Sequence, residues 1–421
     1  MYTHLKNYLS QEQIDKLKEE NAKPLKYKGL LINPFRTNSQ VLFKEFNSIE
    51  EDGDNPNFYT YLKDVDSPGK NILHDAGAYY IMDRSSMIVS KYLEPKGKEL
   101  VLDMCAAPGG KTISYALKNP QALIIANDYS KKRADELSGN IERLGIANVI
   151  VTNFEPRFFL DDFQGYFDKI ILDAPCSGTG MFRKESKMKD DWSYQKTLKL
   201  LPLQDQLLET AYKLLAKGGT LSYSTCSYLK EENEDRIAVL LRNHSDLQLE
   251  QIPLKKGYYE GTIDGTIHLF PHLYRGEGHF LAKVIKDGTT PKLDTAEAKR
   301  DFDITLNLYS FKYKKEKYAL PFYLKSLLNL NAIRMGLKLT NSAKYAKCPF
   351  DHALSHYLDS ANSISLNYEE AKNYLMGQEL TTRSDKPDGF YPVSYLGLNL
   401  GYVNKVGIKL KNCYPKGLRK K

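Results

Sequence analysis

The sequence predicts an α/β fold built around a doubly wound parallel sheet, and three stretches of the chain indicate it. Residues 98–112 read KELVLDMCAAPGGKT, in which a mostly apolar run, suited to a strand buried on both faces, precedes small residues and then a helical pattern. Strand, glycine-rich turn and helix open a nucleotide-binding sheet, whose ligand lies at the carboxyl end of the strand. Two later apolar runs, within 167–183 and 218–233, also end in polar loops that carry glycine or serine.

The turn after the first strand restricts the ligand. Residues 105–112, CAAPGGKT, are small and let a backbone approach a ligand closely. They lack the spacing G-x-x-x-x-G-K-[ST] of a phosphate loop and the G-x-G-x-x-G pattern of dinucleotide folds. A nicotinamide cofactor is therefore disfavoured, and another nucleotide-like cofactor is expected.

The next strands predict where such a cofactor is held. Ala122 to Asn127 is an apolar run that ends in Asp128, about 20 residues past the glycine turn, where α/β cofactor folds bind a ribose diol. The alternative is that Asp128 caps the following helix, which carries Arg133, and the two roles are compatible. After a third strand, Val149 to Thr152, either Asn153 or Glu155 lies beside the adenine, and the residues alone do not decide between them.

Two cysteines and one aspartate are expected to converge. A strand at Ile170 to Leu172 delivers Asp173 and Cys176 to its carboxyl end, and a strand at Thr220 to Tyr223 delivers Cys226. Consecutive strands on this side of a doubly wound sheet are neighbours, so their carboxyl ends lie close together. The alternative is that both cysteines are small apolar fillers, but both follow strands and precede polar loops.

Methylation of carbon 5 of cytosine needs a thiol, a carboxylate and a methyl donor in one site. Carbon 5 becomes nucleophilic only after a thiolate adds to carbon 6, and the thiol must leave again once the carbon-5 proton is lost. Asp173 would bond the Watson–Crick edge of the base. Since a free thiol is only slightly ionised at neutral pH, positive charge nearby is needed, and Lys111 or the sulfonium of the cofactor would supply it.

Four motifs, CAAPGGKT, DAPCSGTGMFRK, YSTCSYLKEENE and RGEGHF, resemble those of the Sun-type (RsmB/RsmF) RNA cytosine-C5 methyltransferases over roughly residues 70–285. The resemblance implies a Rossmann-like class I methyltransferase domain that uses S-adenosylmethionine. It implies that Cys226 is the nucleophile, that Cys176 assists breakdown of the adduct, and that Lys111 and Asp173 contact the cytosine. It also implies a set of cofactor-binding residues: Cys105, Ala106, Ala107, Pro108, Gly109, Gly110, Lys111, Asp128, Arg133, Glu155 and Asp173.

Composition limits the class and the partners. With 421 residues there is room for two or three domains, and a net charge of +8 favours a polyanionic partner. Five cysteines without a C-x-x-C pair argue for a reducing compartment and against a disulfide framework or a zinc site, so no metal is expected. The opening residues have no apolar signal region, and no apolar run reaches 18 residues. These features predict a cytoplasmic protein that does not bind membranes.

The predicted domains are an N-terminal RNA-binding α+β lobe at 1–75, the methyltransferase domain at 76–285, a linker at 286–310 and a C-terminal RNA-binding region at 311–421. In the lobe, Ser10 is expected to cap a helix, and Tyr27 to Phe35 and Val41 to Phe46 are expected to be strands. Phe311 to Tyr318 interleaves aromatics and lysines, which suits either RNA contact or a basic surface strand.

The last 18 residues hold seven Lys or Arg and no acid, which favours RNA contact. The alternation of Val406, Ile408 and Leu410 suggests a strand, followed by a basic loop. Residues 389–420 resemble the small β-rich, PUA-like domain of the RsmF branch, and this resemblance implies 16S rRNA as the substrate, either free or within the 30S subunit.

Three other functions and one detail of the mechanism remain open. The first is an enzyme that modifies tRNA or 23S rRNA, and the second is a DNA cytosine methyltransferase, in which the cysteine of the Pro-Cys motif is the nucleophile. Cys226 and the PUA-like tail argue against DNA. The third is a largely non-catalytic ribosome assembly factor, although Cys226 and Asp173 are both retained. The undecided detail is which group takes the proton from carbon 5: Cys176, Asp173 or a water. Nothing suggests an obligate oligomer, so a monomer is expected.

Overall fold

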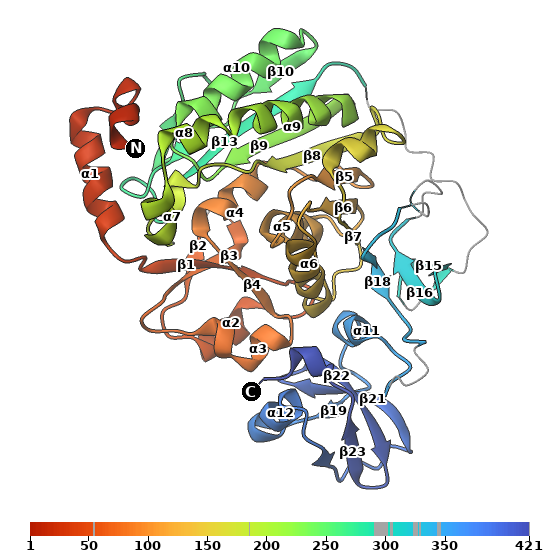
Figure 1. The fold of residues 1–421 in the computed structure, drawn as a ribbon. Coiled ribbons are helices and arrows are strands. Elements are labelled where there is room, and N and C mark those ends of the chain that lie inside the picture. The colour runs from red at the N-terminus through yellow and green to blue at the C-terminus, as the bar shows by residue number, and fades with distance from the viewer. Residues whose placement is uncertain are drawn as a thin grey trace.

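The computed structural model describes residues 1–53, 55–184, 186–289, 302–303, 306–322, 327, 330–342 and 347–420. Within these residues the strands form four sheets, and the largest of them occupies the middle of the molecule (Figure 1). No helix in this described part is both long and apolar enough to cross a membrane.

The central sheet has the strand order β11-β12-β13-β9-β8-β5-β6-β7-β17, and β10 pairs with β13. The five strands from β9 to β7 are parallel, while β13 runs antiparallel to β9. This is the predicted α/β sheet. Its strands are β5 (Leu100–Asp103), β6 (Leu123–Asn127), β7 (Val149–Thr152), β8 (Phe167–Asp173), β9 (Leu215–Thr225), β10 (Leu247–Glu250), β11 (Tyr258–Glu260), β12 (Ile267–Leu269), β13 (His279–Lys286) and β17 (Arg334–Met335).

Helices cover both faces of this sheet because its strands are apolar on both sides (Figure 1). Leu100 and Leu102 belong to a core shared with α9 and α10, whereas Val101 and Ile124 belong to a core shared with α4, α5 and α6. Successive side chains of a strand point to opposite faces, which explains the alternation. The helices are α4 (Arg84–Lys91), α5 (Gly110–Lys118), α6 (Lys131–Arg143), η3 (Pro156–Leu160), η4 (Thr179–Met181), α7 (Ser186–Asp191), α8 (Tyr194–Leu198), α9 (Leu201–Leu214), η5 (Lys230–Glu232) and α10 (Glu234–Asn243).

The strand order reverses at β5. After β5 the chain moves outward through β6 and β7, then returns to place β8 and β9 on the other side of β5. In open α/β sheets, ligands bind beyond the carboxyl ends of the strands at such a switch point. Because β13 is antiparallel to β9, its first residue lies at this same edge.

The N-terminal residues form an antiparallel sheet of order β2-β3-β1-β4. The predicted capping role of Ser10 is confirmed, since its side chain and that of Gln13 each accept from the other's backbone N–H. The predicted strand at Val41 to Phe46 is wrong: the segment is helix α2, whose first turn Asn38 caps by accepting from the backbone N–H of Val41. The elements are η1 (Tyr2–Asn7), α1 (Gln11–Ala22), β1 (Tyr27–Ile32), α2 (Ser39–Glu45), β2 (Glu50–Asp52), β3 (Asn55–Leu62), η2 (Pro68–Lys70), α3 (Ile72–Asp75) and β4 (Tyr79–Met82).

Beyond β13 the chain adds a small sheet of order β14-β15-β16-β18 and contributes β17 to the edge of the central sheet. Phe311, Tyr313 and Tyr318 are buried in the core on the α9 side, so these aromatics are not free to stack on RNA bases. The predicted connection 286–310 contains β14 and the start of β15, and its residues 290–301, 304 and 305 lie outside the described ranges. The strands are β14 (Phe302–Asp303), β15 (Leu308–Tyr313), β16 (Glu316–Leu320) and β18 (Leu337–Lys338).

The C-terminal residues form a sheet of order β19-β21-β22-β23-β20 that shares a hydrophobic core with the N-terminal sheet. The single strand predicted through Val406, Ile408 and Leu410 is wrong. Val406 ends β22, Ile408 lies exposed in the turn, and Leu410 belongs to β23. The elements are α11 (His352–Tyr357), β19 (Ile364–Ser365), α12 (Tyr368–Leu375), β20 (Leu380–Thr381), β21 (Gly389–Tyr395), β22 (Leu398–Val406), β23 (Lys409–Asn412) and η7 (Lys416–Leu418).

Candidate active site

The glycine-rich turn joins β5 to α5 at the switch point. Gly109 has φ +113°, and a Cβ atom there would lie 2.7 Å from Cδ1 of Leu137 on α6, so this position favours glycine twice over. The carbonyl of Pro108 accepts hydrogen bonds from Tyr80 Oη at 3.4 Å and Asn140 Nδ2 at 3.0 Å. The turn is therefore held open by α6 and by the N-terminal sheet.

Asp128 lies beside this turn, directly after β6. Its carboxylate accepts from the backbone N–H of Ala107 at 3.2 Å and of Ser130 at 2.9 Å, and Arg133 Nη1 lies 3.3 Å away. The Arg133 guanidinium also donates to the carbonyl of Ala107. Ser130, rather than Asp128, is the N-cap residue of α6. Asp128 thus ties the turn to the start of α6, and Arg133 joins both.

Asn153 and Glu155, both after β7, differ in their contacts. Asn153 Nδ2 donates to the carbonyls of Asp128 and Tyr129, at 2.7 Å each, so its amide supports the backbone next to Asp128. Glu155 precedes η3 and pairs with the exposed Arg157 at 2.7 Å. The Glu155 side chain is half-buried. Unlike the amide of Asn153, its carboxylate makes no hydrogen bond to the backbone of the described residues.

A buried carboxyl group marks the base of the turn. Asp103, at the end of β5, is buried, and Thr112 Oγ1 donates to its Oδ2 at 2.6 Å, whereas its Oδ1 has no hydrogen-bond partner among the described residues. Burial raises the pKa of Asp103 to about 7, and the negative charges of Asp173 and Asp128 add to this. A cofactor with positively charged groups would relieve this concentration of carboxylates, while phosphates would aggravate it. The turn and its acidic surroundings therefore fit S-adenosylmethionine.

Asp173 ends β8 and meets side chains from three other elements. Lys111 Nζ on α5 lies 2.7 Å from its Oδ2, and Ser224 Oγ on β9 donates to its Oδ1 at 2.7 Å. Burial raises the pKa of Asp173, but the charge of Lys111, with a contribution from His279, outweighs burial and holds that pKa well below its usual range. Asp173 is therefore an ionised acceptor. Lys111 points at it and is not directed at a phosphate site.

The two cysteines lie side by side, Cys176 after β8 and Cys226 after β9. Their Sγ atoms are 3.3 Å apart, within sulfur hydrogen-bond distance. The hydrogen bond with Cys226 and burial raise the pKa of Cys176 well above its usual value. Cys176 therefore stays protonated and can donate its S–H to the sulfur of Cys226.

The loops that carry the two thiols are fixed by buried polar contacts. Glu232 accepts from the backbone N–H of Ser177 at 2.8 Å and from Gln204 Nε2 at 3.1 Å. The backbone N–H of Gly180 donates to the carbonyl of Cys226, and that of Gly278 donates to the carbonyl of Gly180, at 2.9 Å each. Three chain segments thus cross at Gly180 with no room for a side chain.

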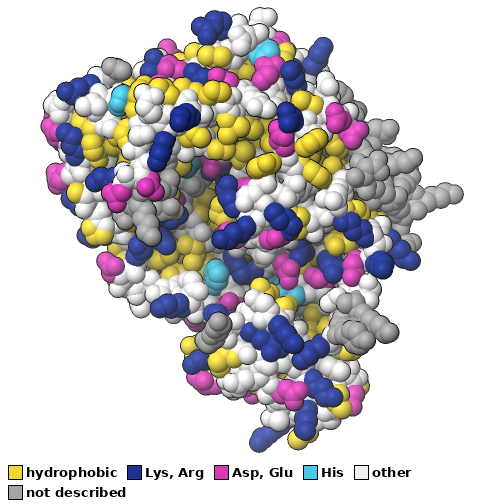
Figure 2. Space-filling view, viewed as in Figure 1, with side chains coloured by type: hydrophobic (Ala, Val, Ile, Leu, Met, Phe, Trp, Pro, Cys, Tyr) yellow, Lys and Arg dark blue, Asp and Glu magenta, His cyan; other side chains and the backbone are white. Residues whose placement is uncertain are grey.

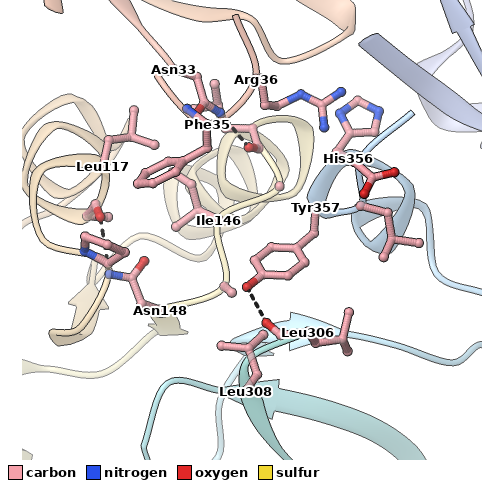
Figure 3. Close-up of a pocket in the computed structure, with 17 residues that line it drawn as sticks. Asn33, Phe35, Arg36, Leu117, Ile146, Asn148, Leu306, Leu308, His356 and Tyr357 are labelled. Carbon is pink, nitrogen blue, oxygen red and sulfur yellow. Dashed lines mark hydrogen bonds between the residues drawn. The ribbon is translucent and has the colours of Figure 1, made fainter. Parts of the chain in front are cut away.

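A cavity of about 390 Å³ elsewhere in the molecule is not part of this site (Figure 3). It lies between the N-terminal sheet, the ends of α5 and α6, and the residues around β15 and α11, with Phe35, Leu117, Ile146 and Leu308 among its walls. Leu117 near the end of α5 and Ile146 just before β7 mark the amino edge of the parallel strands, opposite to the cysteines. The cavity therefore lies where the N-terminal region, the central sheet domain and the C-terminal region meet.

The structure brings the residues singled out from sequence to one edge of the sheet, with 105–111, Asp128, Arg133 and Glu155 around the turn and Asp173, Cys176 and Cys226 beside it. Sequence reasoning missed Ser224 and Glu232, which bond Asp173 and the Cys176 loop. It also gave no role to His279, although RGEGHF was recognised as a motif. Ser224 had one usable signal, because it is a polar residue at the carboxyl end of the predicted strand that leads to Cys226.

Comparisons with known proteins agree with this geometry. Residues 90–285 match the family model described as 16S rRNA methyltransferase RsmB/F, and residues 361–420 match the methyltransferase RsmF PUA domain. A protein named ribosomal RNA small subunit methyltransferase F from Shewanella loihica is 32% identical over 406 residues, covering 87% of this chain and 82% of that protein. The protein of the same name from Citrobacter koseri is 30% identical over 383 residues, covering 83% of this chain and 80% of that one.

Solved structures resemble this fold over 68% of the chain. A methyltransferase homologue from Pyrococcus horikoshii is 30% identical with a TM-score of 0.58, and 93% of its chain is covered. The NSun6 protein from the same organism, solved with the S-adenosylmethionine analogue SFG, is 22% identical with a TM-score of 0.62 and 98% coverage, which shows the fold. On the extent of these matches the chain belongs to the 16S rRNA methyltransferase RsmB/F family, whose members are S-adenosylmethionine-dependent RNA cytosine-C5 methyltransferases.

Proposed function

We propose that this protein methylates carbon 5 of a cytosine in 16S rRNA and that Cys226 forms the covalent bond to carbon 6. The observation that carries the proposal is the pair of thiols 3.3 Å apart beside an ionised aspartate. A hydrolase or a redox enzyme with one reactive cysteine has no need of the second. Cytosine methylation uses both, one to add to the ring and one to assist removal.

The raised pKa of the Cys176 thiol supports Cys226 as the nucleophile. Cys176 is held protonated by its hydrogen bond and burial, so it is a poor nucleophile but a suitable proton donor and acceptor. Its S–H stabilises developing negative charge on the Cys226 sulfur. After methyl transfer, a base (Cys176, Asp173 or a water) takes the proton from carbon 5, and the electron pair of that bond re-forms the carbon 5–carbon 6 double bond. The bond to carbon 6 then breaks with its electron pair on sulfur, so Cys226 leaves as a thiolate and becomes a thiol when that proton is returned to it.

Asp173 and Lys111 are proposed to hold the target base. A carboxylate that stays ionised accepts from the amino group on carbon 4 of cytosine, which uracil lacks, so it selects cytosine. Lys111 keeps Asp173 ionised and fixes the direction of its oxygens. Ser224 fixes the second oxygen.

The proposed cofactor contacts surround the glycine turn. The backbone of 105–110 with Lys111, and the carboxylate of Asp128 for the ribose hydroxyls, form the main contacts, and Arg133 supports both through Ala107. Glu155 is proposed for the adenosine contact, because the amide of Asn153 is engaged with backbone. Asp173 lies where the cofactor and the base meet. When bound, S-adenosylmethionine supplies the methyl group as a sulfonium.

RNA binding is proposed for the flanking regions, 1–75 and 311–421, around the methyltransferase domain at 76–285. The match of 361–420 to a PUA domain supports this for the C-terminal region. Lys409, Lys411 and Lys416 are exposed there. On the face in Figure 2, Lys and Arg side chains gather around a hollow in the middle of the molecule, which suits a phosphate backbone. The target cytosine must leave its stack to reach carbon 6, so a single-stranded or flipped base is the expected substrate.

The protein is further proposed to act as a monomer in the cytoplasm, on 16S rRNA either free or assembled into the 30S subunit. Its net charge of +8 suits both forms of substrate. Sedimentation of the pure protein tests the oligomeric state. Methylation of naked 16S rRNA and of 30S subunits, measured in parallel, tests the form of the substrate.

The decisive experiment follows the covalent adduct. Wild-type protein, Cys176→Ala and Cys226→Ala are incubated with S-adenosylmethionine and, in separate reactions, with 16S rRNA, 30S subunits, 23S rRNA or tRNA, then separated under denaturing conditions. An adduct that accumulates in Cys176→Ala and is absent in Cys226→Ala supports the assignment, and sequencing the trapped fragment identifies the cytosine. The reverse pattern makes Cys176 the nucleophile. Trapping on tRNA or 23S rRNA alone changes the substrate, and neither adduct nor methyl transfer on any RNA would refute an enzymatic role.

A further inference from the structure

His279 is the first residue of β13, the strand that enters the central sheet from the active-site edge. In the antiparallel pairing of β13 with β9, Phe280 lies opposite Thr225. His279 therefore lies at the level of Cys226, next along the chain from Thr225. The preceding residue, Gly278, donates its N–H to Gly180, so the backbone on both sides of His279 is held against the two cysteine loops.

The imidazole of His279 is buried and makes no hydrogen bond to any residue that the structure describes. The residue is 4% exposed, and within the described part of the chain neither Nδ1 nor Nε2 has a hydrogen-bond partner. Its nearest charged partner is Asp173, whose Oδ1 lies 3.8 Å from Nε2, beyond hydrogen-bond distance. Buried polar groups are almost always hydrogen-bonded, so an imidazole that makes no hydrogen bond within the described residues, beside the reacting groups, indicates a missing ligand.

A second buried histidine on the neighbouring strand shows what a structural role looks like. His268 on β12 is fully buried, and its Nε2 lies 2.8 Å from Oε1 of Glu234, which also accepts from the backbone N–H of Thr262. That ring joins β12 to α10. His279 makes no comparable bond and faces the carboxyl edge.

We propose that His279 is a further catalytic residue, whose ring N–H donates a hydrogen bond to the O2/N3 edge of the target cytosine. The inference rests on the proposed function. When the Cys226 sulfur bonds to carbon 6, the electron pair of the carbon 5–carbon 6 double bond spreads through the ring onto N3 and O2. A donor at that edge stabilises the charge, and no proton leaves the imidazole in this step.

The other polar groups of the cluster do not meet this need. Lys111 and Ser224 already donate to Asp173, and Asp173 is itself ionised and can only accept. Of these side chains, His279 is the one whose N–H makes no hydrogen bond within the described residues, its contact with Asp173 being 3.8 Å long. Asp173 therefore accepts from the amino group of cytosine, and His279 donates to the O2/N3 edge beside it.

The test compares His279→Phe, which keeps a ring but removes the N–H, with His279→Gln, which keeps a donor near the position of Nε2. Both are made in the Cys176→Ala background, and the rate of adduct formation is measured at saturating 16S rRNA and S-adenosylmethionine. His279→Phe is expected to slow the adduct about 100-fold, the usual loss when one donor to a developing anion is removed, and His279→Gln to recover to within about tenfold. Cofactor affinity, measured by calorimetry, is expected to change less than about twofold, since within the described residues His279 makes no hydrogen bond to the glycine turn and its contact with Asp173 is 3.8 Å long.

His268→Phe is the matched control for loss of a buried imidazole. It is expected to lower the melting temperature without changing the adduct rate of the folded protein, because Glu234 loses its partner away from the site. The proposal is overturned if His279→Phe forms adduct at the parental rate, if glutamine is no better than phenylalanine, or if cofactor affinity falls in step with the rate. If the Cys176→Ala parent forms no adduct, the rate of methyl transfer is compared for wild type, His279→Phe and His279→Gln. A rate that is lowest in His279→Phe and partly restored in His279→Gln supports the role of His279 with a different covalent step. Equal rates, or no methylation by any of the three, refute the role of His279.

Discussion

The Sγ atoms of Cys176 and Cys226 lie 3.3 Å apart, although the two residues are 50 positions apart in sequence. They are brought together because β8 and β9 are parallel neighbours, with Asp173 opposite Ser224, so that the loops after both strands leave the sheet at the same level. The contact is therefore a property of the sheet, reinforced by the Glu232 and Gly180 contacts of the loops.

Close thiols are expected to make the enzyme sensitive to oxidation. Diamide, which takes two electrons and two protons from a thiol pair, should link Cys176 to Cys226 and abolish methyl transfer, and dithiothreitol should restore it. Cys176→Ser should resist diamide because no second sulfur remains near Cys226. Mass spectrometry after proteolysis identifies the link. Irreversible loss, or equal sensitivity of Cys176→Ser, would contradict the prediction.

Lys111→Met is expected to disable Asp173. Without the ammonium group, burial is opposed mainly by His279 alone, so the pKa of Asp173 rises and its ionised form becomes more costly. In the wild type the lowered pKa of Asp173 supplies stability that is present above its unfolded value of 3.8 and is lost only at lower pH, as pH falls through the folded value. In the variant a raised pKa of Asp173 costs stability above 3.8, and this cost shrinks as pH falls toward 3.8. The variant should therefore be less stable than wild type at pH 7, with a smaller deficit at pH 4, and methylation should fall at least about tenfold, the effect of losing one charge-assisted contact.

The double variant Lys111→Met with Asp173→Asn separates stability from catalysis. It removes both charges, so denaturant unfolding should recover much of the stability lost in the single variant. Methyl transfer should not recover, because the acceptor for the amino group of cytosine is gone. Recovery of activity in the double variant would show that Asp173 does not contact the base.

Alanine at Gly180 and at Gly139 should have opposite effects. A Cβ at Gly180 would lie 2.7 Å from the carbonyl oxygen of Gly278 and 2.8 Å from that of Cys226, so the backbone of the nucleophile loop must move. Adduct formation should fall at least about tenfold, since small displacements of reacting groups are costly, while cofactor binding persists.

Gly139 lies exposed within α6 with nothing near its Cβ, and alanine there should stabilise the protein by about 0.5–1 kcal/mol. Denaturation and trapping on both variants check the pair.

The strands of the central sheet and the glycine turn could be predicted because their residue patterns are local. Leu100 to Asp103 is apolar on both faces, and the small residues after it admit few conformations other than a turn. Val41 to Phe46 failed because a short apolar run suits either a helix or a strand, and the decision came from the cap at Asn38. At 406–410 the alternation was real but spanned a turn at Gly407, where φ is +59°.

For the candidate site, residue types at strand ends predicted which side chains would meet, but not how they would be paired. That Lys111 points at Asp173 depends on the packing of α5 against the sheet, and that Glu232 holds Ser177 depends on the fold of the loop after Cys226. The motif RGEGHF singled out His279 but not its lack of hydrogen bonds: within the described residues its ring makes none, while that of His268 bonds Glu234. Such pairings arise from residues far apart in the chain, for which local patterns carry no information.

Glu277 should make stability fall as pH rises from 5 to 8. Both its carboxylate oxygens are buried and have no hydrogen bond among the residues that the structure describes, and Arg183 Nε approaches only to 3.5 Å. Burial raises the pKa of Glu277 from 4.5 to about 7, against the attraction of Arg183. A raised folded pKa means that the stabilisation is complete below 4.5 and is lost as pH rises through 7, by up to about 3 kcal/mol at roughly 1.4 kcal/mol for each pKa unit. Glu277→Gln should remove this slope from urea unfolding measured between pH 5 and 8, while Glu12→Gln, at an exposed position, should keep it. Equal slopes in wild type and Glu277→Gln would mean that Glu277 is ionised throughout, with Arg183 as a full ion-pair partner.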